Sequence, residues 1–234
     1  MVRSQSRLDS VLETFSIDSQ NVCFLSELKE EQIADHLCES PRSVAFLGQE
    51  SGRVCPEGIS FETRRGCLFI HAGSRIRRKG SKARAGVFIA LGPHLTRLWN
   101  TTGKLLSHSM RHVAIELRLS GHRICVASAY APLSTSSSRL RSSFCSELAS
   151  FASDSTRSVV IGIDSNSSVG TGRHGLAESV GPYNLPHVNA AGRDFQDFLT
   201  THSLCLADTF FPKRNELAMT CLLYTSDAAD DASS

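Results

Sequence analysis

Signals for membrane insertion and for secretion are absent from this sequence. Its 234 residues contain no apolar stretch that approaches the length of a membrane span. The first residues, Met1-Val2-Arg3-Ser4-Gln5-Ser6, are not followed by the apolar core of a signal peptide. We therefore expect an intracellular protein, nuclear or cytoplasmic, that is not secreted and has no membrane partner.

The cysteines lack the spacing of a metal site. The eight are Cys23, Cys38, Cys55, Cys67, Cys125, Cys145, Cys205 and Cys221, and no two of them form a C-x-x-C pair. This scatter argues against a zinc site, and an intracellular chain of this size is not expected to depend on disulfides. Most of the cysteines are expected to be reduced thiols that pack as small apolar side chains.

A strong excess of one charge is also absent. The chain has 25 Lys and Arg against 23 Asp and Glu, which gives a net charge of +2. A nucleic-acid partner must therefore be argued from local charge. Hydrophobic residues make up 41% and charged residues 21%, as in ordinary globular proteins. With no internal repeat and no clear linker, residues 1–220 are predicted to form one domain.

The last residues differ in character from the rest of the chain. Residues 221–234 read Cys-Leu-Leu-Tyr-Thr-Ser-Asp-Ala-Ala-Asp-Asp-Ala-Ser-Ser. This string resembles a translated transposase adapter of the kind ligated to DNA fragments for sequencing. We expect it to be a non-native tail, with the native sequence interrupted near Thr220. A natural acidic tail is the alternative.

Apolar patterns predict more strands than helices. Short apolar runs predict strands at 21–25, 44–47, 67–70, 86–91, 159–163 and 204–210, and strict alternation at 113–119 predicts a hairpin with 123–130. Helical spacing predicts helices at 26–40, 138–152 and 189–202. Hairpins mixed with helical crossovers indicate an α/β fold. We predict a four-layer sandwich of two mixed β-sheets flanked by helices, incomplete at the C-terminus.

Polar side chains stand where several of these strands end. Asn21 lies at the first strand, Glu50 follows the second, and Tyr130 ends the hairpin. Asp164 and Asn166 follow the apolar run at 159–163. Each signal is weak alone, because Asp, Asn and Ser commonly form turns and a single Glu or Tyr usually lies on a surface or in a core. In this chain order, the four strand ends form a specific combination.

The motifs around these residues carry a family resemblance. They are Asn21-Val22, Gln49-Glu50, Gly86-Val87-Phe88-Ile89-Ala90-Leu91-Gly92-Pro93, Ser128-Ala129-Tyr130-Ala131-Pro132, Ile163-Asp164-Ser165-Asn166-Ser167-Ser168-Val169-Gly170, Asn189-x-x-Gly192-Arg193 and Leu204-Cys205-Leu206-Ala207-Asp208-Thr209-Phe210-Phe211. Through these motifs, residues 15–220 resemble the exonuclease–endonuclease–phosphatase superfamily. Within it, the chain is most similar to the apurinic-type endonuclease domain of non-LTR retrotransposons.

Two kinds of departure from that family are visible. The family usually has Gly-Asp-Phe-Asn where this chain has Ile163-Asp164-Ser165-Asn166, and Thr or His where Ser51 follows Gln-Glu. A Trp-bearing strand, a Leu-Asp-Tyr strand and a terminal Ser-Asp-His, which the family adds further on, have no counterpart in this sequence. The chain is therefore expected to be inactive or severely impaired.

The resemblance implies a metal-dependent phosphodiester hydrolase that nicks DNA to prime reverse transcription, with a reverse transcriptase region downstream in the full-length element. Glu50 would bind Mg²⁺, or Mn²⁺ in its place, with Asn21 supporting the metal site. Asp164 would orient or deprotonate the attacking water, and Asn166 would hold Asp164 and a phosphate oxygen. Tyr130 would donate a hydrogen bond to a non-bridging oxygen.

Other functions remain open at this point. A phosphatase or phospholipase of the same superfamily shares the fold, since fold does not decide chemistry. A non-catalytic fragment that binds nucleic acid weakly is a third possibility. The cations that would contact DNA phosphates lie in one loop and are Arg75, Arg77, Arg78, Lys79 and Lys82. A solvated loop without any ligand explains these cations equally well.

Overall fold

A computed structural model describes residues 16–40, 42–75, 85–119, 121–171 and 178–212. The chain divides into two compact units. The first contains the residues up to Ala131 together with Ser146–Ser165, and the second contains Pro132–Cys145 together with the residues from Asn166 onward. The predicted tail at 221–234 lies outside the described residues. No described helix combines the length and the apolar character that crossing a membrane requires.

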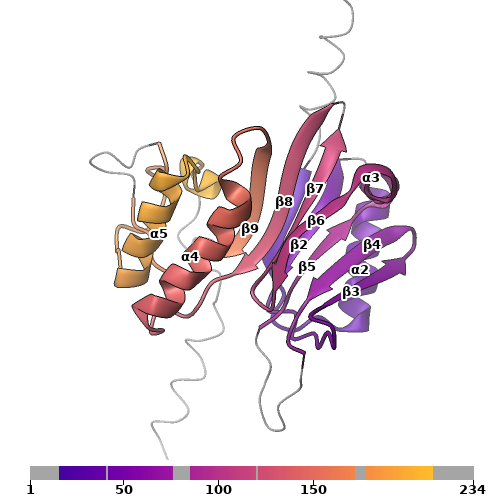
Figure 1. The fold of residues 1–234 in the computed structure, drawn as a ribbon, viewed down its shortest axis with the longest axis horizontal. Helices are drawn as coiled ribbons and strands as arrows, with labels where there is room; N and C mark the ends of the chain where they lie inside the picture. The colour runs from indigo at the N-terminus through magenta and orange to yellow at the C-terminus, as the bar shows by residue number, and fades with distance from the viewer. Residues whose placement is uncertain (1–15, 41, 76–84, 120, 172–177, 213–234) are drawn as a thin grey trace, which may run out of the picture. The chain divides into compact units, whose positions relative to one another are not determined.

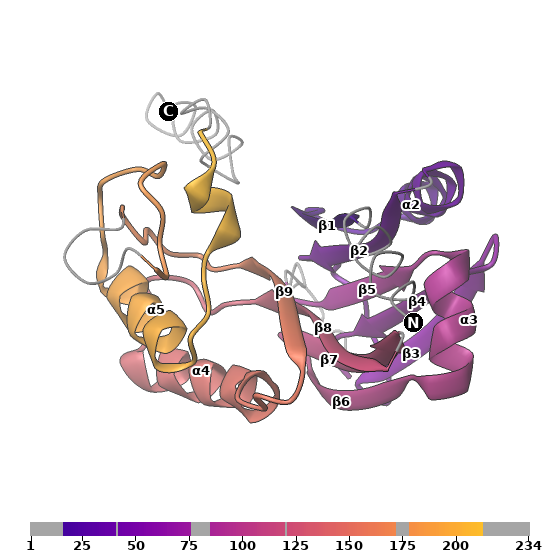
Figure 2. The same cartoon turned by 90° about the horizontal axis from the view of Figure 1, so that it is seen from above.

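The first unit contains both β-sheets (Figures 1 and 2). The five-stranded sheet has the order β1-β2-β5-β4-β3, made of β1 (Ser16–Asn21), β2 (Ser43–Gln49), β5 (Val87–Leu91), β4 (Cys67–Ala72) and β3 (Ile59–Arg64). The four-stranded sheet has the order β6-β7-β8-β9, made of β6 (Lys104–Ser109), β7 (His112–Leu119), β8 (His122–Tyr130) and β9 (Ser158–Asp164). Both sheets are mixed: β1 pairs with β2 and β8 with β9 in parallel, and the other pairs are antiparallel.

The main core fills the space between the two sheets. Alternate residues of the strands, such as Leu47 of β2, Ile89 of β5 and Ile115 of β7, are buried in one apolar cluster. Helix α3 (Pro93–Thr102), which connects the two sheets along the chain, adds Leu95 to this cluster. Trp99 of α3 is partly buried against the same core. Residues of β2 and β7 therefore alternate between the inter-sheet core and the outer faces.

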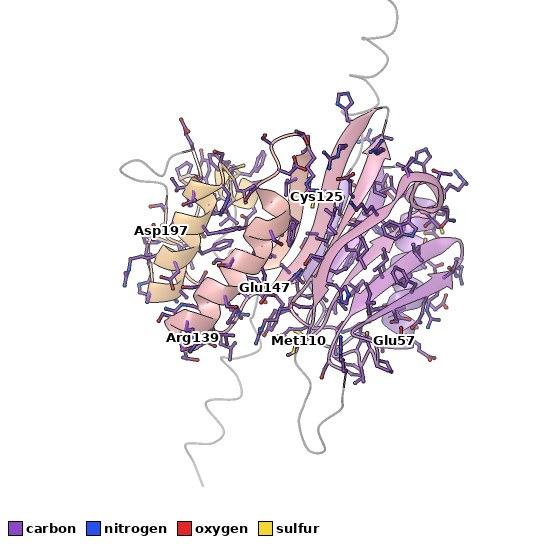
Figure 3. The ribbon with its side chains drawn as sticks, viewed as in Figure 1. Glu57, Met110, Cys125, Arg139, Glu147 and Asp197 are labelled. Carbon is purple, nitrogen blue, oxygen red and sulfur yellow. The ribbon has the colours of Figure 1, made fainter. Side chains whose placement is uncertain are left out.

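Helices cover both outer faces. Helix α2 (Glu27–Glu39) begins at the cap residue Ser26 and packs Ile33 and Leu37 into a cluster with Phe69 of the first sheet. The part of helix α4 (Ser138–Ala152) that belongs to the first unit places Glu147 (Figure 3) and Phe151 against His112 of β7. The succession helix, sheet, sheet, helix confirms the predicted four-layer α/β sandwich.

The second unit contains the rest of α4, helix α5 (Ala190–Thr201) and a short 3-10 turn at Ala207–Phe210. Helix α5 buries Phe195, Phe198 and Leu199 on one face. Two isolated bridges, Val169 with Val188 and Val180 with Leu206, supply its only strand-like pairing in the described residues. Whether residues 1–220 form one domain stays a prediction.

Most predicted elements are confirmed, including the three helices and the hairpin of β7 and β8. Two predicted strands are wrong. The first strand ends at Asn21 rather than covering 21–25, because Cys23 and Phe24 have positive φ angles of 45° and 86°. The segment 204–210 forms a single bridge and a 3-10 turn. Strands β3 and β6 and helix α3 were not predicted.

Candidate active site

The structure brings four of the predicted side chains together within the first unit. In one sheet, the parallel strands β1 and β2 end side by side at Asn21 and Gln49. In the other sheet, the parallel strands β8 and β9 end side by side at Tyr130 and Asp164. The Asn21 Nδ2 atom donates to Asp164 Oδ2 at 2.8 Å. The Tyr130 hydroxyl donates to Glu50 Oε1. Each of these two contacts joins a strand end of one sheet to a strand end of the other.

Glu50 adopts a conformation that is unusual for its residue type. Its φ angle is 56°, in the left-handed region, where a non-glycine residue has a strain energy of about 1–3 kcal/mol. Backbone hydrogen bonds hold the strained turn: Phe24 N donates to the Glu50 carbonyl at 2.8 Å and Ser51 N to the Gly86 carbonyl at 2.9 Å. Among the described residues, no donor contacts the second carboxylate oxygen, so that oxygen is available to a cation.

Asn21 is fixed at both ends of its amide. Its Nδ2 donates to Asp164, and its Oδ1 accepts a hydrogen bond from the Cys23 backbone N at 3.0 Å. Asp164 itself is 9% exposed, and its carbonyl accepts from Ala131 N at 2.9 Å. The hydrogen bond from Asn21 to Asp164 was not predicted from the sequence. The expected support of Asp164 by Asn166 stays a prediction. The expected metal-side role of Asn21 stays a prediction.

A buried polar cluster lies directly beneath these four side chains. Gln49 is 2% exposed, and its Nε2 reaches the Leu47 carbonyl at 3.1 Å in its own strand. The same atom reaches Ser128 Oγ at 3.2 Å and the Gly162 carbonyl at 3.4 Å in the other sheet. Ser128 Oγ in turn donates to the Gly48 carbonyl at 2.9 Å. We call Gln49, Ser128 and Gly162 the inter-sheet clamp, because they tie β2 to β8 and β9.

Gly162 allows the sheets to approach closely at the clamp. A Cβ atom at this position would lie 2.4 Å from Ser19 Oγ and 2.7 Å from Leu47 Cβ, which no side chain can accept without movement. Gly162 precedes Asp164 by two residues on β9, so the two share a face of the strand. The close approach at Gly162 therefore sets how near Asp164 comes to Asn21.

Arg111 is a component of the site that sequence reasoning missed. Its guanidinium Cζ lies 5.8 Å from the centre of the Tyr130 ring, and Nη1 donates to the carbonyls of Tyr130 and Ala131 at 3.4 and 3.3 Å. Burial lowers the pKa of Arg111, and the neighbouring Tyr130 and Glu147 oppose that shift. Extending the predicted hairpin register by one residue beyond His112 would have found Arg111 opposite Tyr130.

Asn166 belongs to the second unit and is placed relative to the other four only by its position in the chain, two residues after Asp164. Its φ angle is 46°, a conformation that Asn tolerates better than most residues. The segment that follows is held by α5. Gly192 packs so tightly that a Cβ atom would lie 1.9 Å from the Ser168 carbonyl oxygen, and Gln196 Nε2 donates to the Val169 carbonyl at 2.6 Å.

The Asn189-x-x-Gly192 motif thus has a structural explanation. Asn189 caps α5 by accepting a hydrogen bond from Gly192 N at 2.7 Å, and its own backbone N donates to the Ser168 carbonyl at 3.1 Å. Both contacts fix the start of the helix against the segment after Asn166. The motif therefore holds Ser168, which follows Asn166 in the same unit.

Most of the predicted cationic loop lies outside the residues that the structure describes. Arg75 is exposed. The other four cations, Arg77, Arg78, Lys79 and Lys82, lie outside the described residues. Their contact with DNA stays a prediction.

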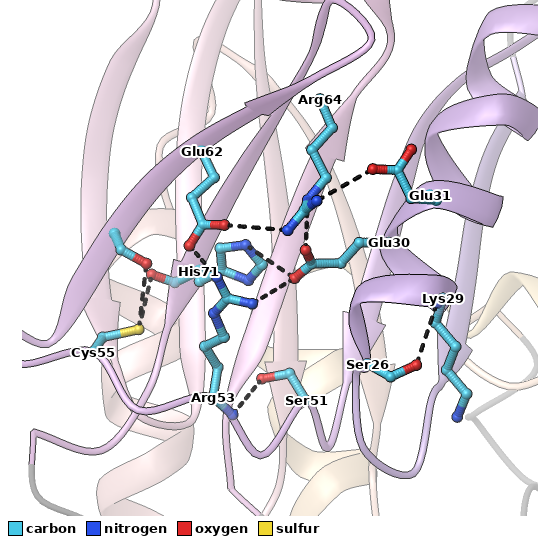
Figure 4. Close-up of polar contacts among 11 residues, drawn as sticks. Ser26, Lys29, Glu30, Glu31, Ser51, Arg53, Cys55, Glu62, Arg64 and His71 are labelled. Carbon is cyan, nitrogen blue, oxygen red and sulfur yellow. Dashed lines mark hydrogen bonds and ion pairs between the residues drawn. The ribbon is translucent and has the colours of Figure 1, made fainter.

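A separate charged cluster lies between α2 and the first sheet (Figure 4). Ligand atoms of Glu30, Glu62 and His71 come within 4.8 Å of one another, which is close enough for a shared metal ion. Two arginines already occupy the carboxylates, however. Arg53 Nη1 lies 2.7 Å from Glu30 Oε1 and Arg53 also pairs with Glu62, while Arg64 Nε lies 2.6 Å from Glu30 Oε2.

The charges of this cluster balance without a metal. Two carboxylates face two guanidinium groups, and burial lowers the pKa of His71 to about 4, so its imidazole is neutral. Burial raises the pKa of Glu30, and the two arginines oppose that shift. A divalent cation would have to displace the arginines from oxygens they contact at hydrogen-bonding distance. The cluster therefore connects α2 to β3 and β4 as an ion network, apart from Glu50.

A cavity of about 310 Å³ opens beside Asn21, between β1 and α2. Its floor includes Ile33 and Phe46. Two basic residues in its wall contact protein groups: Lys29 Nζ donates to the Val22 carbonyl at 2.6 Å, and the His36 ring lies 2.9 Å from the Asp18 carboxylate. The cavity lies beside Asn21, and the Lys29 ammonium in its wall is held by the Val22 and Phe24 carbonyls.

Comparison with known proteins gives similarity of architecture only. No protein-family model matches the chain, and no curated protein matches it. Among solved structures, the chain is similar to the endonuclease domain of TRAS1, a telomere-specific non-LTR retrotransposon, with a TM-score of 0.48, 12% identity, and coverage of 80% of this chain and 70% of that one. It is also similar to the Haemophilus ducreyi cytolethal distending toxin, with a TM-score of 0.37, 15% identity, and coverage of 66% and 68%.

Proposed function

We propose that the strand-end site belongs to a metal-dependent phosphodiester hydrolase that nicks DNA. One observation carries this proposal: at the junction of the two sheets, Tyr130 holds the Glu50 carboxylate and Asn21 holds the Asp164 carboxylate, each by a hydrogen bond from the opposite sheet. A carboxylate for a cation, a second carboxylate for water and a phenol as donor are groups that can take part in phosphodiester hydrolysis. Phosphate monoesters are the competing substrate class.

Each side chain of the site would have its own role in hydrolysis. Asp164, held by Asn21, accepts the proton of the attacking water or orients that water toward phosphorus. Tyr130 exchanges its hydrogen bond with Glu50 for one with a non-bridging phosphate oxygen, and the Arg111 guanidinium beside its ring adds positive charge near that oxygen. Asn166 supplies a further amide donor to the phosphate.

The residues present fit a hard divalent cation. Glu50 offers a carboxylate oxygen that has no donor among the described residues, and such oxygen ligands suit Mg²⁺ or Mn²⁺. Bound at Glu50, the ion would neutralise phosphate charge and stabilise the leaving oxygen. Before phosphate binds, the Tyr130 hydrogen bond orients the Glu50 carboxylate for this purpose.

We propose further that this protein is the endonuclease of a retroelement, whose nick primes synthesis by a reverse transcriptase encoded downstream. The family motifs discussed with the sequence support this assignment. Because the sequence contains no Leu-Asp-Tyr or Ser-Asp-His motif, residues 1–234 are proposed to catalyse nicking only weakly. Catalytic groups that act as a unit lose orders of magnitude in rate when part of the set is missing.

Nicking of supercoiled plasmid in Mg²⁺ tests the function, with purified wild-type protein at high concentration. Slow nicking that EDTA stops is expected, and Asp164→Ala should lower its rate by about 10²–10⁴-fold, the contribution of a positioned base. Asp197→Ala, at an exposed position on α5 (Figure 3), is the matched control and should keep the wild-type rate. Nicking that survives Asp164→Ala unchanged would refute the site.

Two further measurements separate the parts of the proposal. Mn²⁺ binding, followed by electron paramagnetic resonance, should weaken in Glu50→Gln and stay unchanged in Glu57→Gln, whose exposed carboxylate lies outside the site (Figure 3). Hydrolysis of bis(p-nitrophenyl) phosphate in preference to p-nitrophenyl phosphate supports diester chemistry, and the reverse preference favours a phosphatase. Efficient Asp164-dependent nicking would keep the function and overturn the proposed weak activity.

A further inference from the structure

Two cysteines distant in sequence lie in contact on the outer side of the first sheet. Cys38 is in the last turn of α2 and Cys67 is the first residue of β4, and their sulfur atoms are 3.7 Å apart. Their surroundings differ. Cys38 is exposed, whereas Cys67 is fully buried within the cluster that α2 shares with the sheet.

Backbone contacts fix the sulfur atoms near each other. The Cys38 thiol donates to the Arg65 carbonyl at 3.4 Å, and the Cys67 thiol to the Ala34 carbonyl at 3.8 Å. Each thiol therefore binds a carbonyl in the segment that carries the other cysteine. The two sulfurs need to move together by less than 2 Å to reach the disulfide distance of about 2.05 Å. Cys38 is one residue from the end of α2, where helices yield most easily.

We propose that Cys38 and Cys67 are a peroxide-responsive pair that forms a reversible intramolecular disulfide. In the first step the exposed Cys38 sulfur attacks the O–O bond of a peroxide, which gives Cys38 sulfenic acid and releases an alcohol or water. In the second step the Cys67 sulfur attacks the Cys38 sulfur, the S–O bond breaks, and the hydroxyl leaves as water with the Cys67 proton. The two thiols lose two electrons, and the peroxide gains them.

The surroundings of the two thiols determine which of them reacts with peroxide first. Burial and the neighbouring Cys38 thiol raise the pKa of Cys67 to about 12, so Cys67 is a poor first nucleophile and has no access to solvent. Contact with the Cys38 sulfur offsets this low reactivity, because the second step is intramolecular. Cys23 and Cys205 are also exposed, and the Cys23 thiol donates to Asn21 Oδ1 at 3.3 Å.

Peptide mapping after peroxide treatment tests the pair in the protein of residues 1–234. Trypsin places Cys38 in the peptide 30–42 and Cys67 in the peptide 66–75, and every other described cysteine falls in a different peptide. Hydrogen peroxide should produce these two peptides as one linked species, lighter than their sum by two hydrogens. Dithiothreitol should separate them again.

Three controls make the result decisive. Cys38→Ser should abolish the linked species, and Cys205→Ser should leave its yield unchanged. The same treatment of protein unfolded in urea should spread the links over many cysteine pairs. Recovery of Cys38 from folded wild-type protein mainly as sulfinic or sulfonic acid, or linked to any cysteine other than Cys67, would overturn the proposal.

Discussion

Replacing Gln49 should loosen the junction of the two sheets on which the candidate site rests. The Gln49 amide has two N–H groups and lies 3.1–3.4 Å from four acceptors, which are the Leu47 and Gly162 carbonyls and the hydroxyls of Ser19 and Ser128. It therefore makes at most two well-aligned hydrogen bonds at a time and shares them among the four. Gln49→Leu keeps most of the side-chain volume and removes both donors.

The expected loss follows from these contacts. Two buried hydrogen bonds contribute about 1 kcal/mol each, and leaving their acceptors without a donor adds about 1–2 kcal/mol. Gln49→Leu should therefore lower the free energy of unfolding by about 3–4 kcal/mol, a large part of the roughly 5–15 kcal/mol of a typical domain. Gln49→Glu should destabilise more, because it brings a charged acceptor against two carbonyl oxygens.

Urea unfolding measured by the fluorescence of Trp99, the only tryptophan of the chain, gives the free energy directly. Gln32→Leu, at an exposed position on α2, is the matched control and should change stability by less than about 0.5 kcal/mol. Gln49→Leu combined with Ser128→Ala should lose less than the sum of the two single changes, because the residues share a hydrogen bond. A loss below about 0.5 kcal/mol in Gln49→Leu would refute the clamp.

Three further outcomes are expected from other parts of the structure. Burial lowers the pKa of His71 to about 4, whereas an unfolded histidine has a pKa near 6.5. The unfolded state therefore binds more protons between these values, so stability should fall by roughly 3 kcal/mol as the pH drops from about 6.5 to 4, and His71→Leu should flatten that slope in urea titrations. Gly192→Ala should push the Ser168 carbonyl away from α5, lower stability by about 1–3 kcal/mol and speed proteolysis of the adjoining segment, and unchanged proteolysis would count against the packing described. Tyr130→Phe removes the donor to Glu50 and should change Mn²⁺ affinity while leaving the fold intact, as circular dichroism can check; an unaltered affinity would separate Tyr130 from the metal site.

Strong apolar periodicity made part of the fold predictable. The alternation in β7 and the helical spacing in α4 each specify which face is buried, so their bounds were close to those observed. Strands β3 and β6 were missed because they are partly exposed and carry many polar residues. Helix α3 was missed although Pro93 stands at its start, a position that favours proline. Its cap residue Gly92 has no side chain to mark the boundary.

The strand-end positions of the candidate residues were predictable, and their contacts were not. Strand-end positions identified Asn21, Glu50, Tyr130 and Asp164 separately, but the contact between Asn21 and Asp164 joins residues 143 positions apart. Local patterns determine neither the parallel register of β8 with β9 nor the distance between two sheets. For that reason the hydrogen bond from Asn21 to Asp164 was not predicted.

The motifs behind the family resemblance mix two kinds of residue. On β8, Ser128 is part of the inter-sheet clamp, and Tyr130, which lies on the same face of the strand, is part of the candidate site. On β9, Gly162 is part of the clamp and Asp164 is part of the candidate site.

A sandwich with this junction needs the clamp residues whether or not it cleaves phosphodiesters. The motifs therefore support the fold more strongly than the activity, and only changes restricted to side chains such as Asp164 distinguish the two. If Asp164→Ala keeps the wild-type stability and removes nicking, the site is catalytic. If Asp164→Ala instead destabilises as strongly as Gln49→Leu, the hydrogen bond from Asn21 serves the fold.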